Sequence, residues 1–203
     1  MKHIYIIAEI GCNHCGDPVC AKVMIEKAKA CGVDAVKFQT FKAAELISKY
    51  APKADYQKKT TGSDENQLEM TRKLELPYDE FIKLRDYAIS IGLDVFSTPF
   101  DMDSIDFLEK SGQAIWKIPS GEVTNLPFLE RIAKYKIQGK KIILSTGMCT
   151  MKEVHRAVDV ICEYEDPKNL VVLHCNTEYP TPDEDVNLSG IDTLHEELPG
   201  IEI

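Results

Sequence analysis

Short apolar segments alternate with amphipathic segments along the chain. The apolar segments are rich in isoleucine, valine and leucine, which is typical of buried strands. The segments between them place apolar residues at helical spacing, as Phe81, Leu84 and Ala88 do after Pro77. Strict strand–helix alternation indicates a parallel sheet covered by helices. We expect the strands at residues 3–10, 33–40, 93–97, 114–118, 141–144 and 170–173.

Two architectures fit this alternation, a doubly wound open sheet and a (β/α)8 barrel. No Gly-x-Gly-x-x-Gly follows the first strand, which counts against a dinucleotide-binding open sheet. All six strands carry reactive or hydrogen-bonding residues at their C-terminal ends, and a barrel gathers such ends around one mouth. We therefore predict an α/β chain with a TIM-type (β/α)8 barrel.

The predicted barrel is incomplete over residues 1–203. Six strand–helix units precede residues 200–203, which resemble the start of a seventh strand. Six strands and this short segment cannot close an eight-stranded barrel. We therefore expect one partial barrel domain that belongs to a longer parent protein, with strands seven and eight missing from this chain.

Composition narrows the class of protein. The chain has 203 residues, 44% of them hydrophobic and 28% charged, with a net charge of −9. These values are typical of a soluble globular domain, and the negative charge argues against a nucleic-acid binder. The apolar run at residues 4–10 contains Glu9 and is too short for a signal peptide or membrane span, so we expect a cytoplasmic protein with no membrane partner.

Two lysines interrupt otherwise apolar strands near their C-terminal ends. Lys37 and Lys117 would be costly to bury without an anionic partner. One interpretation is that they bind a phosphate or carboxylate, helped by the hydroxyl groups of Thr98, Ser120 and Ser145. A second is a Schiff-base lysine of an aldolase, and a third is structural pairing with a carboxylate. We favour a functional role over the structural one.

Two carboxylates follow the first and fourth strands. Glu9 and Glu122 are able to coordinate a metal, act as acid or base, or neutralise the two lysines, and their residue types leave these roles open. Cys12 and Cys15 form a single Cys-x-x-Cys, which is weak evidence for zinc, so we interpret them as incidental thiols in a turn. We interpret His174 as a core histidine with its hydrogen bonds satisfied.

The hydrophobic pattern weakens over residues 41–77. The segment is punctuated by Lys49, Lys53, Lys58 and Lys59, and residues 60–64 have the composition of a loop. Connections of this length inside a compact domain are usually lids or binding loops. We expect the segment to contact a substrate.

Six motifs, in order along nearly the whole chain, suggest a family. They are Ala8-Glu9-Ile10-Gly11-x-Asn13-His14-x-Gly16, Val36-Lys37-Phe38-Gln39-Thr40, Ser97-Thr98-Pro99-Phe100, Trp116-Lys117-Ile118-Pro119-Ser120-Gly121-Glu122, Leu144-Ser145-Thr146-Gly147-Met148 and Tyr179-Pro180-Thr181-Pro182. In this combination the chain resembles the sialic acid synthase family. That resemblance implies a parent enzyme that condenses phosphoenolpyruvate with an N-acetylated amino sugar to form a nine-carbon sialic-type acid and phosphate.

The resemblance also implies roles for individual residues. Glu9 and Glu122 match the catalytic carboxylates. Gln39 and Tyr179 match positions on the sugar side, and Thr177 is a further substrate-binding position. Asn176-Thr177 departs from the usual family turn, as Cys15 does in the first loop. The positions that match the phosphoenolpyruvate-binding motifs are Lys37, Thr98, Lys117, Ser120 and Ser145.

The family resemblance further implies a divalent metal (Mn or Mg), a homodimer and a C-terminal antifreeze-like domain. The metal-binding histidines of the family lie on strands seven and eight, so we assign no metal ligand to this chain. N-acetylmannosamine is the favoured sugar, with legionaminate and pseudaminate synthases as alternatives that share the motifs. A Schiff-base aldolase using Lys117 or Lys37, and a non-catalytic remnant, are more distant alternatives. We expect this chain to be inactive alone.

Overall fold

The computed structural model describes residues 3–51 and 66–203. The chain divides into two compact units, Met1–Ser111 and Gly112–Ile203, and each is described by itself. Part of the weakly patterned segment, including the expected loop at residues 60–64, lies outside the described residues. On either side of it, the short helices α2 (Ala43–Leu46) and α4 (Gln67–Arg72) contact each other.

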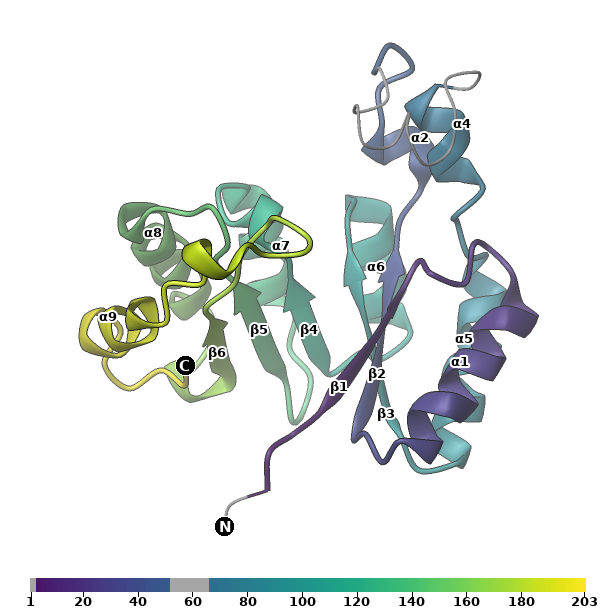
Figure 1. The fold of residues 1–203 in the computed structure, drawn as a ribbon, viewed down its shortest axis with the longest axis horizontal. Coiled ribbons are helices and arrows are strands. Elements are labelled where there is room, and N and C mark those ends of the chain that lie inside the picture. Colours follow the sequence, from purple (N-terminus) through teal and green to yellow (C-terminus); the bar gives the residue numbers. More distant parts are fainter. Residues whose placement is uncertain (1–2, 52–65) are drawn as a thin grey trace. The chain divides into compact units, whose positions relative to one another are not determined.

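The first unit is built on a three-stranded parallel sheet in the order β1-β2-β3. Helices α1 and α5 pack against each other and lie along one face of this sheet (Figure 1). The elements are β1 (Ile7–Gly11), α1 (Pro18–Ala30), β2 (Ala35–Thr40), α5 (Tyr78–Ser90), β3 (Asp94–Pro99) and α6 (Met102–Lys110).

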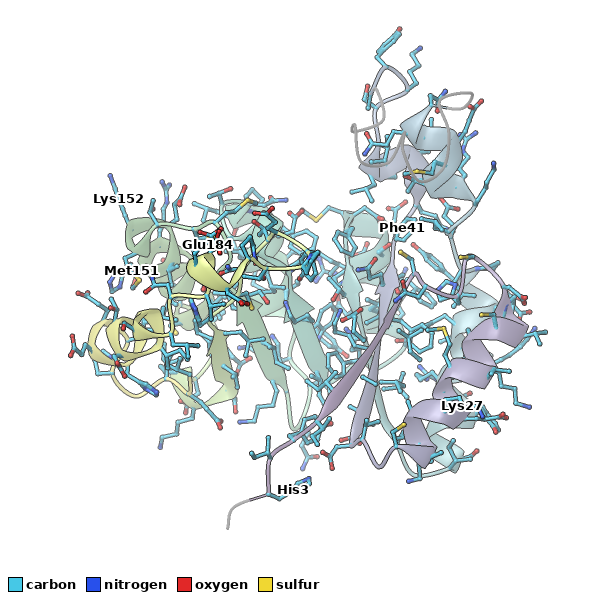
Figure 2. The ribbon with its side chains drawn as sticks, in the orientation of Figure 1. His3, Lys27, Phe41, Met151, Lys152 and Glu184 are labelled. Atoms are coloured by element: carbon cyan, nitrogen blue, oxygen red, sulfur yellow. The ribbon has the colours of Figure 1, made fainter. Side chains whose placement is uncertain are left out.

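Local chemistry explains where α1 begins and which side it buries. The Asp17 carboxylate accepts a hydrogen bond from the Val19 N–H at 2.8 Å, and Pro18 occupies the first turn, where its missing N–H costs nothing. Ala21 and Ile25 are fully buried, whereas Lys27 is exposed (Figure 2). The helix thus turns a narrow apolar stripe toward the sheet.

Side chains of β2 point alternately to two faces of the sheet, one packed against helices and one carrying polar groups. Val36 and Phe38 are fully buried, and the Phe38 ring meets Phe81 of α5 edge-on at 5.6 Å. Lys37 and Gln39 point to the opposite face, because successive side chains in a strand alternate. The expectation that Lys37 and Gln39 share a face is therefore confirmed.

The second unit repeats the plan with a parallel sheet in the order β4-β5-β6. One face of it is fully buried and carries Trp116, Ile142 and Leu144. Helices α7 and α8 pack against each other beside this sheet (Figure 1). The elements are β4 (Ile115–Ile118), η1 (Ser120–Glu122), α7 (Leu126–Lys134), β5 (Lys141–Ser145), α8 (Met151–Cys162), η2 (Pro167–Asn169), β6 (Leu170–Leu173), η3 (Asp183–Asp185) and α9 (Ser189–Glu197).

A buried lysine closes the C-terminal end of α7. Lys140 is 3% exposed, and its Nζ donates to the carbonyl oxygens of Ile132, Ala133 and Tyr135 at 2.7, 3.0 and 2.6 Å. The Glu165 carboxylate lies 3.3 Å from the same Nζ. These carbonyls are among those that a helix end leaves without an intrahelical partner, so the ammonium group stabilises the end of α7.

All six expected strands are present, with one clear error at the first. Residues 3–6 lie outside β1, which begins at Ile7, and Ile4 is 78% exposed. The Ile6 N–H donates to the Asp34 side chain at 2.7 Å, and its carbonyl accepts from the N–H groups of Asp34 and Ala35 at 2.9 and 3.2 Å, so the chain first reaches β2 at Ile6. Near the C-terminus, Glu202 forms an isolated parallel bridge with Val171 of β6, as the start of a further strand would. Closure of the strands into a barrel stays a prediction.

Candidate functional site

An ion pair lies at the C-terminal end of the first sheet. Lys37 on β2 is 8% exposed, and its Nζ lies 2.6 Å from Oε2 of Glu9 on β1. The same ammonium group donates to Oγ1 of Thr98 on β3 at 3.0 Å. Neighbouring strands thus bring together three of the predicted site residues. The interpretation that Glu9 pairs with Lys37 is confirmed. The catalytic role of Glu9 stays a prediction.

Gly11 leaves the space that this ion pair needs. It ends β1 with φ +55°, a conformation that glycine adopts without strain. A Cβ atom at this position would lie 2.9 Å from Glu9 Oε1 and 3.7 Å from the Gln39 side-chain amide. The half-buried Gln39 is therefore a close neighbour of Glu9, and both stand beside Gly11.

A second lysine–hydroxyl pair lies at the C-terminal ends of β4 and β5. The Lys117 Nζ donates to Oγ of Ser145 at 2.6 Å and to the Ile118 carbonyl at 2.8 Å. Ser145 is 7% exposed, and the Cys175 thiol also donates to its Oγ, at 3.5 Å. The two predicted phosphoenolpyruvate ligands of these strands are therefore in direct contact.

The short helix η1 carries the next two predicted residues. The Ser120 Oγ accepts the Gly147 N–H at 2.9 Å, which connects the ends of β4 and β5. The Glu122 carboxylate accepts from Asn125 Nδ2 at 2.6 Å, before α7 begins. The interpretation that Glu122 neutralises a lysine is not tested, and its catalytic role stays a prediction.

The hydroxyl groups of both clusters have one property in common. Thr98 and Ser145 each accept from a lysine ammonium, and Ser120 accepts from a backbone amide. Because each oxygen already receives a hydrogen, the hydroxyl's own hydrogen is left to donate elsewhere. Ammonium groups beside such hydroxyls suit an anion with several oxygen acceptors.

The two predicted residues after β6 are exposed. Thr177 lies over the β5 turn, since a Cβ atom on Gly147 would be 2.9 Å from its methyl group. Tyr179 is 88% exposed. The structure thus groups Glu9, Lys37, Gln39 and Thr98 in one unit and Lys117, Ser120, Ser145 and Thr177 in the other. The expected convergence of Lys37 and Lys117 on one ligand stays a prediction.

The sequence reasoning missed the two glycines that shape these clusters. Gly11 and Gly147 are part of the motifs given above, but a motif does not reveal which side chains pack against a glycine. It also missed Cys175 and Asn125, whose contacts to Ser145 and Glu122 have no signal in the strand and helix pattern.

Histidines and cysteines take structural positions. His14 is 1% exposed, its Nδ1 accepts the Gly16 N–H at 3.0 Å, and burial lowers its pKa, opposed by the Gly11 backbone. His174 is half-buried with Nε2 3.0 Å from the Val186 carbonyl, as expected for a satisfied histidine. All seven cysteines are free thiols, and the interpretation of Cys12 and Cys15 as incidental thiols stays a prediction.

The described residues do not supply a metal site. Within residues 3–51 and 66–203, no three histidine, cysteine, aspartate or glutamate side chains are grouped so as to hold a metal ion. We therefore assign no metal ligand within these residues and derive no step through a metal. In the same residues, no helix has the length and apolarity needed to cross a membrane.

Comparisons with known proteins place these clusters in a family context. The sequence profile of the NeuB family matches residues 24–203 of this chain. N,N'-diacetyllegionaminic acid synthase of Campylobacter jejuni is 49% identical over 195 residues, 96% of this chain and 58% of that protein. The Legionella pneumophila enzyme of the same name is 45% identical over 197 residues, 96% of this chain and 54% of that protein.

A solved structure shares the fold as well. The N-acetylneuraminic acid (sialic acid) synthetase of Leptospira borgpetersenii, crystallised in complex with citrate, superposes with a TM-score of 0.80 at 30% identity. The match covers 97% of this chain and 62% of that one. The chain thus spans little more than half the length of the proteins that it matches.

Proposed function

Because the chain belongs to the NeuB family, we propose that its full-length protein joins phosphoenolpyruvate to an acetylated amino sugar. The product is a nine-carbon sialic-type acid, and phosphate is released. The observation that carries this proposal is the pair of lysine–hydroxyl contacts, Lys37 with Thr98 and Lys117 with Ser145. Phosphoenolpyruvate carries a phosphate and a carboxylate, which are the anions that such contacts favour.

In the proposed reaction, C3 of phosphoenolpyruvate attacks the aldehyde carbon of the sugar and forms the new carbon–carbon bond. The aldehyde oxygen takes up a proton and becomes a hydroxyl group. Water then adds to the cation left at C2 and loses a proton, and the adduct breaks its C2–O bond to the phosphate, which leaves a ketone at C2 and free phosphate. We assign Lys37, Lys117 and the hydroxyls of Thr98, Ser120 and Ser145 to binding the anionic groups. Hydrogen bonds already hold the three hydroxyl oxygens in place, which reduces the reorganisation that anion binding requires.

The two carboxylates take the proton-handling roles in this proposal. Half of the Glu9 side chain is exposed, so its carboxylate is accessible to water while it stays paired with Lys37. A carboxylate that is accessible to water and fixed by a neighbouring ammonium group is suited to orient the attacking water or accept a proton from it. Glu122, fixed by Asn125, is the second candidate, and Gln39, Thr177 and Tyr179 are proposed to contact the sugar.

The comparisons change the preferred sugar. N-acetylmannosamine was the favoured substrate from the motifs, but the 49% and 45% identities are to diacetyllegionaminic acid synthases, against 30% to the sialic acid synthetase. We therefore propose the diacetamido hexose that corresponds to N,N'-diacetyllegionaminic acid without its three pyruvyl carbons. The divalent metal, the homodimer and the cytoplasmic location implied by the family belong to the same proposal.

Product analysis on the full-length protein tests this function. Incubation with phosphoenolpyruvate, manganese and the diacetamido hexose should release phosphate and yield a nine-carbon acid by mass spectrometry. N-acetylmannosamine should react more slowly, and the 203-residue chain alone should give neither product. Turnover of N-acetylmannosamine alone would correct the sugar, and absence of phosphate release with both sugars would refute the proposal.

A further inference from the structure

The turn after β5, residues 146–149, contains Gly147 at a position whose backbone conformation does not require glycine. The Cys149 N–H donates to the Thr146 carbonyl at 3.2 Å, which closes a four-residue turn. Its third residue, Met148, has φ +58°, the conformation that favours glycine, whereas its second residue, Gly147, is not left-handed. A strained methionine thus follows a glycine that the turn itself does not need.

Crowding around residue 147 explains why glycine occupies this position. The residue is buried, and an ideal Cβ atom there would lie 2.9 Å from the Thr177 methyl group, 3.1 Å from the Cys175 carbonyl oxygen and 3.1 Å from the Ser120 Oγ. Real Cβ atoms essentially never approach a neighbour within 3.0 Å, and contacts of 3.1 Å are unusually tight. An alanine would therefore push apart groups from the ends of β4 and β6.

Hydrogen bonds hold these groups against Gly147. Its N–H donates to the Ser120 Oγ at 2.9 Å. The Cys149 thiol lies 3.3 Å from the Gly147 carbonyl and 3.7 Å from the Ser120 carbonyl. On the other side, the Thr146 N–H and hydroxyl both donate to the Leu173 carbonyl at the end of β6, at 3.2 and 2.8 Å.

We propose that Gly147 is a positioning residue that sets the location and the donor direction of the Ser120 hydroxyl. Its missing side chain lets Ser120 approach, and its N–H occupies the serine oxygen, so the hydroxyl hydrogen points to another acceptor. This inference rests on the proposed function, in which that acceptor is an oxygen of phosphoenolpyruvate.

A double-mutant cycle tests the inference. In the full-length protein, G147A should weaken phosphoenolpyruvate binding about tenfold, as expected when a hydrogen bond to an anion is lost, with a smaller change in kcat. S120A should have a similar effect. The double variant G147A/S120A should bind phosphoenolpyruvate little worse than S120A does, because without Oγ the new Cβ has no Ser120 hydroxyl to displace, although its contacts with Thr177 and Cys175 remain. M148G, which relieves the strain at the next residue, serves as control and should keep wild-type affinity within about twofold.

Two outcomes would overturn the inference: affinity losses of G147A and S120A that multiply in the double variant, or wild-type affinity in G147A. If G147A does not fold, G147A/T177S, which lacks the methyl group that the new Cβ would meet, replaces it in the cycle. Urea unfolding of the same variants gives a second reading that needs no activity, since positioning predicts non-additive stability changes. A wild-type protein that neither binds nor turns over phosphoenolpyruvate would refute the proposed function, while the unfolding cycle would still decide the role of Gly147.

Discussion

The Lys37 ammonium lies 2.6 Å from the Glu9 carboxylate, with the lysine side chain 10% exposed and the glutamate side chain 50% exposed. One partner of this ion pair is therefore fixed by the fold, and the other is open to solvent. A carboxylate with an accessible side is able to accept a proton or orient a water without unfolding of its surroundings. A buried ammonium, in contrast, presents its charge in a low-dielectric environment where an incoming anion is held more strongly.

Replacement of Lys37 tests this arrangement. K37M keeps a long apolar side chain but removes the ammonium group, so it should weaken phosphoenolpyruvate binding by about tenfold to a hundredfold. The fold should persist, because Glu9 is half exposed and is hydrated when its partner is removed. Calorimetric titration of the full-length protein with phosphoenolpyruvate measures the change.

The matched control for this variant is K27M, which alters an exposed lysine of α1 (Figure 2). It has the same change in net charge and should bind phosphoenolpyruvate as the wild type does. Equal losses in K37M and K27M would mean that overall charge, and not a site at the end of β2, controls the affinity.

The Schiff-base alternative predicts a covalent product. Lys117 donates to the Ser145 hydroxyl and the Ile118 carbonyl, which stabilise an ammonium rather than the neutral amine that attacks a carbonyl. Sodium borohydride added in the presence of pyruvate or the nine-carbon acid should therefore leave the mass of the protein unchanged. A mass increase that disappears in the K117M variant would instead establish an imine at this residue.

Lys140 should contribute more to stability than other lysines near α7. K140M removes the shared donor of two buried carbonyl groups and one half-buried one, together with a buried partner of Glu165, so it should destabilise the protein by about 3–5 kcal/mol. K134M removes an exposed pair with Glu130 and a cation–π contact with the Tyr164 ring at 5.0 Å, and its effect should be small. The comparison of urea midpoints for the two variants measures the difference, and equal midpoints would contradict the prediction.

His14 should make stability depend on pH in the mildly acidic range. Burial lowers the pKa of His14 in the folded chain, so the unfolded chain binds a proton at a higher pH than the folded chain does. This contribution is fully present above about pH 6.5, the ordinary histidine value, and is lost as the pH falls toward the lowered pKa. The free energy of unfolding should therefore decrease as the pH falls below about 6.5.

The H14N variant isolates this contribution. Asparagine offers an acceptor to the Gly16 N–H in place of Nδ1 but does not titrate, so the pH dependence below about 6.5 should become shallower. H195N, which changes an exposed histidine of α9, is the control. An unchanged slope in H14N would show that other groups cause the acid sensitivity.

The strands, and the sheet face to which Lys37 points, were predictable from the sequence because both follow from the spacing of residues. A period of two places Lys37 and Gln39 on one face, and the structure has them there. The error at residues 3–6 has a physical cause, since apolar residues such as Ile4 and Ile6 satisfy a strand pattern whether or not a neighbouring strand reaches them. Only the partner, which begins at Ala35, decides where β1 starts.

Contacts between distant residues could not be predicted in the same way. Lys140 and Lys141 are neighbours of the same type, yet one is 3% exposed and the other is exposed on β5. Nothing in their immediate sequence marks Lys140 as the residue that the carbonyls of α7 surround. The contact between Gly147 and Ser120 likewise depends on two turns that the parallel sheet brings together, and neither turn alone reveals it.

The alternation of β2 has a consequence for how such proteins diverge. A slip of one residue would carry Lys37 into the apolar layer beneath α5 and turn Phe38 toward the ion pair, so fold and chemistry would fail together. New sugar preferences are therefore expected to accumulate in the connections that leave the strand ends, such as the exposed stretch around Tyr179, while the strands themselves stay in step.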